Sequence, residues 1–149
     1  MAPIIAAIAA CGTPLAPSRR AIEATSPQTM TRSILLVDDE PEILAAWCLI
    51  LEREGYEVSC ANNGAEALAC ACAHVPDLIV TDWTMPVMDG AELCRSLKAM
   101  PQLADVPILL HTAVPPSEGE ARNWSFYLRK PSGVEYFLTM IARLCRGDR

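Results

Sequence analysis

Short apolar runs alternate with amphipathic stretches along most of this chain. Residues 34–37 and 78–80 are rich in branched aliphatic side chains and are bounded by polar, Pro or Gly residues. Runs of this kind are typical of strands buried on both faces, whereas apolar residues at helical spacing fill the intervals between them. The pattern predicts strands at 34–37, 56–61, 77–82, 106–111 and 126–128, and helices at 41–54, 64–74, 90–100, about 117–123 and 134–145.

This alternation of strand and helix predicts one α/β domain of the (βα)5 type, spanning residues 33–147. Strands joined by helices favour a five-stranded parallel sheet that is doubly wound, with right-handed crossovers and helices on both faces. Pro41 suits the first turn of the first helix, and Gly55 ends that helix. No internal repeat and no transmembrane run interrupts the pattern.

Residues 1–32 have a different composition, dominated by Ala, Pro, Ser and Thr without any period. We expect a disordered leader there, or a wrongly assigned start, because Met30 stands just before the first strand pattern. The run that ends at Cys11 resembles a lipoprotein signal, but no Lys or Arg precedes it. We therefore predict neither export nor membrane attachment.

Composition and charge narrow the possible function. The formal net charge is -6 and the pI is about 4.8, which argues against direct nucleic-acid binding because such a surface needs basic residues. A protein partner is favoured instead. The seven cysteines form neither a disulfide framework nor a zinc motif, so a cytoplasmic location is expected. On a helix, Cys72 would point away from Cys70 and His74, so no metal site is predicted there.

Candidate functional residues follow four of the predicted strands. In a parallel sheet of this type the carboxyl ends of the strands meet at one edge, where ligands bind. The residues concerned are Asp38, Asp39, Asp82, Thr112 and Lys130. Three clustered carboxylates repel one another unless a cation lies among them, and Mg²⁺ prefers such oxygen ligands. With a lysine and a hydroxyl added, the set predicts a phosphoryl-transfer site in which a carboxylate is the nucleophile.

Four motifs resemble the receiver domain of two-component response regulators. They are LLVDDEP at 35–41, DLIVTDWTMPVMDG at 77–90, ILLHTA at 108–113 and LRKP at 128–131. The resemblance implies a flavodoxin-like fold with strand order 2-1-3-4-5, of the stand-alone chemotaxis-regulator kind. It also implies a bacterial phosphoprotein that is not an enzyme, apart from Mg²⁺-dependent phosphorylation and dephosphorylation of its own aspartate.

The resemblance assigns a role to each acidic candidate. Asp82 becomes the phosphoacceptor, Asp39 a direct ligand of Mg²⁺ and Asp38 a ligand acting largely through water. The backbone carbonyl of Thr84 would complete the protein ligands.

Further residues receive roles in the response to phosphorylation. Thr112 would be the switch hydroxyl, Lys130 the lysine that contacts the phosphoryl group and Tyr127 the switch aromatic. A cis peptide is implied at Lys130–Pro131. His111 is expected to be an ordinary strand residue facing a helix or the sheet surface.

The implied function is phosphorelay signal transduction. A sensor histidine kinase or phosphotransfer protein would phosphorylate Asp82, and the receiver would then bind a downstream target protein. The alternative is a constitutive interaction module with little switching. The segment 113–129 is shorter than usual for the family and contains Pro115 and Pro116, so the fourth helix is expected to be short or irregular.

Overall fold

The computed structural model describes residues 31–147, in which five strands alternate with four helices. The predicted leader, except for residues 31 and 32, and the lipoprotein-like Cys11 lie outside the described residues. In chain order the elements are β1 (Ser33–Val37), α3 (Pro41–Arg53), β2 (Glu57–Ala61), α4 (Gly64–Ala73), β3 (Leu78–Thr81), α5 (Gly90–Ala99), β4 (Ile108–Thr112), β5 (Phe126–Arg129) and α6 (Val134–Cys145).

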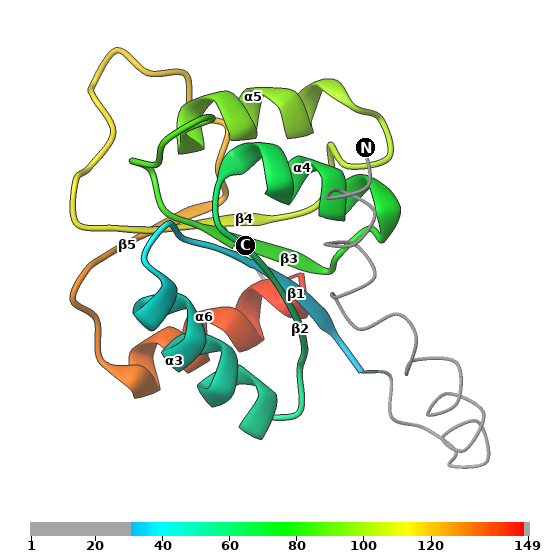
Figure 1. Ribbon diagram of the computed structural model, residues 1–149, viewed down its shortest axis with the longest axis vertical. Coiled ribbons are helices and arrows are strands. Elements are labelled where there is room, and N and C mark those ends of the chain that lie inside the picture. Colours follow the sequence, from blue (N-terminus) through cyan, green and yellow to red (C-terminus); the bar gives the residue numbers. More distant parts are fainter. Residues whose placement is uncertain (1–30, 148–149) are drawn as a thin grey trace.

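All five strands are parallel and lie in the order β2-β1-β3-β4-β5. Helices α4 and α5 cover one face of the sheet, and α3 and α6 cover the other (Figure 1). The predicted α/β fold, doubly wound sheet and strand order are therefore confirmed.

Alternate residues of the central strands fill two separate cores. On the α4/α5 face, Leu35, Ile79 and Leu110 are almost fully buried. Their neighbours Leu36 and Val80 pack on the opposite, α3/α6 face. Because both faces are covered, the strands read as continuous apolar runs rather than as an alternation, which is why the sequence pattern located them.

Local signals explain where the helices begin. Pro41 occupies the first turn of α3, where its missing N–H leaves no hydrogen bond unmade. The side chain of Asn63 caps α4 by accepting from the Glu66 N–H, and Asp89 caps α5 by accepting from the Glu92 N–H at 2.9 Å. These caps start the helices directly after the loops that follow β2 and β3.

One predicted helix is absent from the described residues, which leaves four helices in place of the five of a (βα)5 pattern. Residues 113–125 between β4 and β5 form turns and irregular backbone, and the helix expected at about Ser117–Asn123 is wrong. Only one backbone turn, Glu120 N–H to Ser117 C=O, is made there. The segment is short, and a helix of so few residues is marginal without strong tertiary packing.

Candidate functional site

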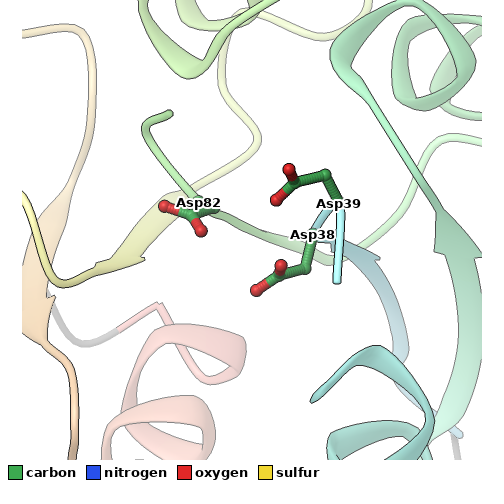
Figure 2. Close-up of side chains that lie close together, drawn as sticks. All are labelled: Asp38, Asp39 and Asp82. Atoms are coloured by element: carbon green, nitrogen blue, oxygen red, sulfur yellow. The ribbon is translucent and has the colours of Figure 1, made fainter. Parts of the chain in front are cut away.

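Three carboxylates meet at the carboxyl ends of β1 and β3. Asp38 and Asp39 directly follow β1, and Asp82 directly follows β3 (Figure 2). One ligand oxygen from each lies within 4.8 Å of the others, and within residues 31–147 no other group of three or more His, Cys, Asp or Glu side chains is so arranged. Asp38 is buried, Asp82 is half-buried and Asp39 is exposed. The group is therefore an acidic site with one side open to solvent.

Lys130 joins this group from the end of β5. Its Nζ donates to Asp38 Oδ2 at 2.7 Å and to Asp82 Oδ2 at 3.2 Å. Burial disfavours the charged ammonium, but the hydrogen bond and charge of Asp38, together with Asp82, outweigh burial and raise the pKa of Lys130. The ammonium group is thus held in its charged form between the two carboxylates.

The Asp82 carboxylate is oriented by the backbone that follows it. Its Oδ1 accepts from the Trp83 N–H at 2.6 Å and more weakly from the Thr84 N–H at 3.4 Å. Its own N–H donates to the Val37 carbonyl at 3.0 Å, which ties the end of β3 to the end of β1. Oδ2 therefore faces Lys130, while Oδ1 faces the loop.

Within the described residues, neither the Thr112 hydroxyl nor the Tyr127 hydroxyl is hydrogen-bonded to a carboxylate of the site. Thr112 is 1% exposed, and its Oγ1 exchanges hydrogen bonds with the backbone of Val114, at 3.2 Å from the N–H and 3.3 Å from the carbonyl. Tyr127 packs against the α4/α5 core, and within the described residues its buried hydroxyl has no hydrogen-bond partner. The Lys130–Pro131 peptide is cis, as the resemblance implied.

The chain is similar in sequence and in fold to proteins of a known family. A family model of the response regulator receiver domain matches residues 34–141. This chain belongs to that family. The resemblance drawn from the four motifs is thereby confirmed, and the family is a regulatory one rather than a family of catalytic enzymes.

Curated relatives of this receiver include bacterial transcriptional regulators. It is 36% identical over 121 residues to the DNA-binding dual master transcriptional regulator RpaA of Synechocystis sp., in a match that covers 78% of this chain and 50% of that protein. It is 45% identical over 84 residues to the alkaline phosphatase synthesis transcriptional regulatory protein PhoP of Bacillus subtilis, covering 56% and 34% respectively. The chain thus spans half or less of the length of these two relatives.

Solved structures of single receiver domains align over nearly their whole length. The chemotaxis protein CheY4 of Vibrio cholerae is 34% identical with a TM-score of 0.72, covering 77% of this chain and 99% of that one. The response regulator TrrA of Thermotoga maritima, solved in complex with Mg²⁺ and BeF, is 30% identical with a TM-score of 0.70, covering 76% and 99%.

One polar contact near the site joins His111, expected to be an ordinary strand residue, to Ser132, which the sequence analysis did not name. The His111 imidazole is buried next to the aromatic rings of Trp47 and Phe137, and its Nε2 lies 3.0 Å from Ser132 Oγ. Burial, and after it the nearby Lys130 charge, lower the pKa of His111 to about 4, against the opposing effect of Asp38 and Asp82. Ser132 follows LRKP directly, but nothing in its type or spacing marked it as the partner of a residue 21 positions away.

Two further observations concern the described part of the receiver. Cys70 is buried, whereas Cys72 and His74 are exposed, and the three do not form a group of potential metal ligands. No helix within residues 31–147 has the length and apolar character needed to cross a bilayer.

Proposed function

We propose that this receiver accepts a phosphoryl group on Asp82 and changes its binding to a target protein in response. The observation that carries the proposal is that the two oxygens of the Asp82 carboxylate have different partners. Oδ1 accepts hydrogen bonds from backbone amides, while Oδ2 accepts from the Lys130 ammonium at 3.2 Å. A carboxylate held in this way lies at the open edge of the sheet with a cation ready to neutralise the group that it receives.

The acidic cluster fits a magnesium ion. Three carboxylates within 4.8 Å offer hard oxygen donors, and Asp39 is exposed, which leaves room for ligand waters. We assign Asp39 and Asp82 as direct ligands, Asp38 as a ligand through water, and the Thr84 carbonyl as a further ligand. When bound, Mg²⁺ would neutralise phosphoryl oxygens.

Phosphoryl transfer forms one bond and breaks one. An Asp82 carboxylate oxygen attacks the phosphorus atom of a phosphohistidine, the P–N bond breaks, and its electron pair leaves with the imidazole nitrogen of the donor. Lys130 gives up no proton, because its raised pKa keeps it charged, and its ammonium balances the phosphoryl charge. Acetyl phosphate reacts in the same way, with acetate as the leaving group.

We assign the response to Thr112 and Tyr127. The Thr112 hydroxyl, now bonded to the Val114 backbone, would turn to a phosphoryl oxygen and vacate space for the Tyr127 ring. Within the described residues the buried Tyr127 hydroxyl has no hydrogen-bond partner, so no protein hydrogen bond is broken when its ring turns, and inverting a two-state population takes ~5 kcal/mol in all.

Receiver domains interact with histidine kinases or phosphotransfer proteins and with downstream targets. We propose both kinds of partner here, in the cytoplasm, with no direct nucleic-acid contact by residues 33–147. Stand-alone action stays a prediction, since the two curated relatives described above are longer regulatory proteins.

The second candidate is constitutive binding, which the irregular β4–β5 connection favours. Val114 is 54% exposed and leads into Pro115 and Pro116, and such a segment can serve as a fixed docking surface. This function needs the fold but not the phosphorylation of Asp82.

Reaction with acetyl phosphate and Mg²⁺, followed by intact mass, distinguishes the two candidates. We expect the wild type to gain the mass of one phosphoryl group and Asp82→Asn to gain none. Asp89→Asn is the matched control, because Asn caps a helix as well as Asp does. A wild type that never gains mass, or an Asp82→Asn protein that gains it equally, would show the proposal to be wrong.

A further inference from the structure

His111 is one of few buried polar residues in the described receiver. The others are Asp38, Thr81 and Thr112, and all four lie at or beside the carboxyl ends of β1, β3 and β4. Asp38 and Thr112 already have roles in the proposed chemistry, and Thr81 donates to the Asp82 carbonyl. His111 lies on the α3/α6 side of the sheet, between the Trp47 and Phe137 rings. An aliphatic side chain could pack there without any hydrogen bond, whereas the buried imidazole needs a hydrogen-bond partner.

Two aromatic rings and one hydroxyl group lie next to the imidazole. The ring is 5% exposed, with the Trp47 ring centre at 5.5 Å and the Phe137 ring centre at 4.9 Å. Nε2 finds the Ser132 hydroxyl at 3.0 Å. A buried polar atom without such a partner is strongly disfavoured, so this hydrogen bond holds the two residues together.

Ser132 belongs to the turn that carries Lys130. On one side of this turn, the Lys130 N–H donates to the Thr112 carbonyl at 3.0 Å. On the other side, the Ser132 hydroxyl is bonded to His111. Both anchors come from the last two residues of β4, so the Lys130 backbone is fixed on either side by the same strand.

A small cavity lies beside the imidazole and borders the acidic site. Asp38, Asp82, Trp47 and His111 are among its lining residues, and it has room for about one water molecule. Within the described structure His111 makes no hydrogen bond to either carboxylate, and its hydrogen-bond link to the site runs through Ser132 in the turn at residues 130–132.

We propose that His111 is a positioning residue of the phosphoacceptor site, which holds Ser132 and so fixes the turn that places the Lys130 ammonium between Asp38 and Asp82. The inference rests on the proposed function of Lys130 in phosphoryl transfer. His111 itself touches neither the phosphoryl group nor the acceptor.

The first measurement needs no phosphorylation. Lys130 and Lys98 are the two lysines of this chain, so ¹⁵N-labelled protein gives two side-chain ammonium signals. An ammonium held by two carboxylates exchanges its protons slowly. We expect a persistent Lys130 signal in the wild type, and a weakened or lost one in His111→Leu and in Ser132→Ala. Thr139→Ala removes an exposed hydroxyl that bonds to the Glu135 carbonyl, and this control should keep the signal.

The second measurement is the rate of phosphorylation by acetyl phosphate and Mg²⁺. We expect each substitution to slow it about fivefold, the factor corresponding to one neutral hydrogen bond. The double variant should be no slower than His111→Leu alone, because both changes break the same link. Ser132→Thr retains the hydroxyl and should restore both the rate and the Lys130 signal.

The outcomes separate this inference from the proposed function. If the wild type is phosphorylated but His111→Leu and Ser132→Ala keep the wild-type rate and signal, His111 is only a packed core residue. If the wild type is not phosphorylated, the proposed function fails, while the Lys130 signals still decide whether His111 positions that side chain.

Discussion

At the scale of single residues, the acidic side chains of the site differ in what they contact. Asp38 is 6% exposed and forms an ion pair of 2.7 Å with Lys130, the shortest within residues 31–147, while its other oxygen accepts from the Glu40 N–H. Asp39 is exposed and has no ion pair with Lys130 in the described structure. The two adjacent aspartates therefore have different environments: Asp38 binds the Lys130 ammonium, whereas Asp39 is exposed to solvent.

This difference predicts separable effects on metal binding. Asp39→Asn should weaken Mg²⁺ affinity at least about tenfold, because a ligand charge is lost, and should leave the free energy of unfolding nearly unchanged. Trp83 adjoins Asp82, so a Mg²⁺ titration followed by its fluorescence measures the affinity. Glu42→Gln, a similar change in the first turn of α3, is the control. Equal affinity in Asp39→Asn and wild type would contradict the ligand assignment.

His111 makes a second prediction at this scale, on pH. Its pKa is lowered by burial to about 4 from an ordinary 6.5, so the unfolded chain binds the proton more tightly. Stability from this residue is complete above pH 6.5 and is lost as the pH falls toward 4, by at most on the order of 3 kcal/mol. Urea unfolding at several pH values measures it.

The control for that experiment lies in the same chain. His111→Leu should flatten the pH dependence of the unfolding free energy between pH 6.5 and 4, whereas His74→Leu, at an exposed position, should retain it. A wild-type slope that persists in His111→Leu would assign the effect to other groups.

At the scale of elements, the loop after β3 and the start of α5 hold the acceptor in place. The Gly90 N–H donates to the Trp83 carbonyl at 2.8 Å. A Cβ atom at Gly90 would lie 2.6 Å from the Asp82 carbonyl oxygen and 2.8 Å from the Trp83 Cα. Both are backbone atoms that cannot turn aside, so α5 approaches the acceptor this closely only because residue 90 is glycine.

We expect Gly90→Ala to destabilise the domain and to impair phosphorylation together. Alanine favours a helix by up to about 1 kcal/mol, but the backbone overlap should outweigh this gain, for a net loss of roughly 1–3 kcal/mol. Gly133→Ala, at the N-cap of α6 with no atom within 4 Å of the added Cβ, should be nearly neutral. Chemical denaturation of both variants tests the contrast, and equal stabilities would contradict it.

The β4–β5 connection is the element in which this receiver departs from the predicted pattern. Its irregular backbone ends at Trp124, whose ring packs edge-on against Trp83 with ring centres 5.4 Å apart. The aromatic contact between Trp124 and Trp83 thus holds this non-helical connection next to the residue that follows Asp82. The sequence indicated an irregular segment through its prolines, but did not indicate this contact.

At the scale of the whole molecule, the proposed ligands join segments distant in sequence and should stabilise the fold. Mg²⁺ with beryllofluoride would contact the ends of β1, β3 and β5 together. A ligand at one hundred times its dissociation constant adds about 2.7 kcal/mol to the unfolding free energy. We therefore expect the thermal midpoint to rise in their presence. Asp82→Asn should lose the part that depends on beryllofluoride, and an undiminished rise in that variant would place the anion elsewhere.

The sequence by itself determined the five strands, four of the five predicted helices and the polar residues that meet at one edge of the sheet. Buried parallel strands appear in the sequence as continuous apolar runs. A polar residue directly after such a run, such as Asp38 after β1 or Asp82 after β3, is therefore easy to recognise. Since the carboxyl ends of parallel strands meet at one edge, the acidic cluster and Lys130 could be predicted before any geometry was known. Boundaries shifted by one or two residues, because the ends of strands depend on hydrogen bonds made to neighbours.

Only the tertiary structure decided which partner each polar group has. The ion pairs of Lys130, the bond of the Thr112 hydroxyl to Val114 and the His111–Ser132 hydrogen bond join residues by distance and direction, which composition and spacing do not encode. The missing fourth helix is of the same kind, because residues 117–123 have no prolines of their own and their local pattern predicted a helix that the folded chain does not form. Local patterns specify elements, whereas contacts across the sheet specify the site.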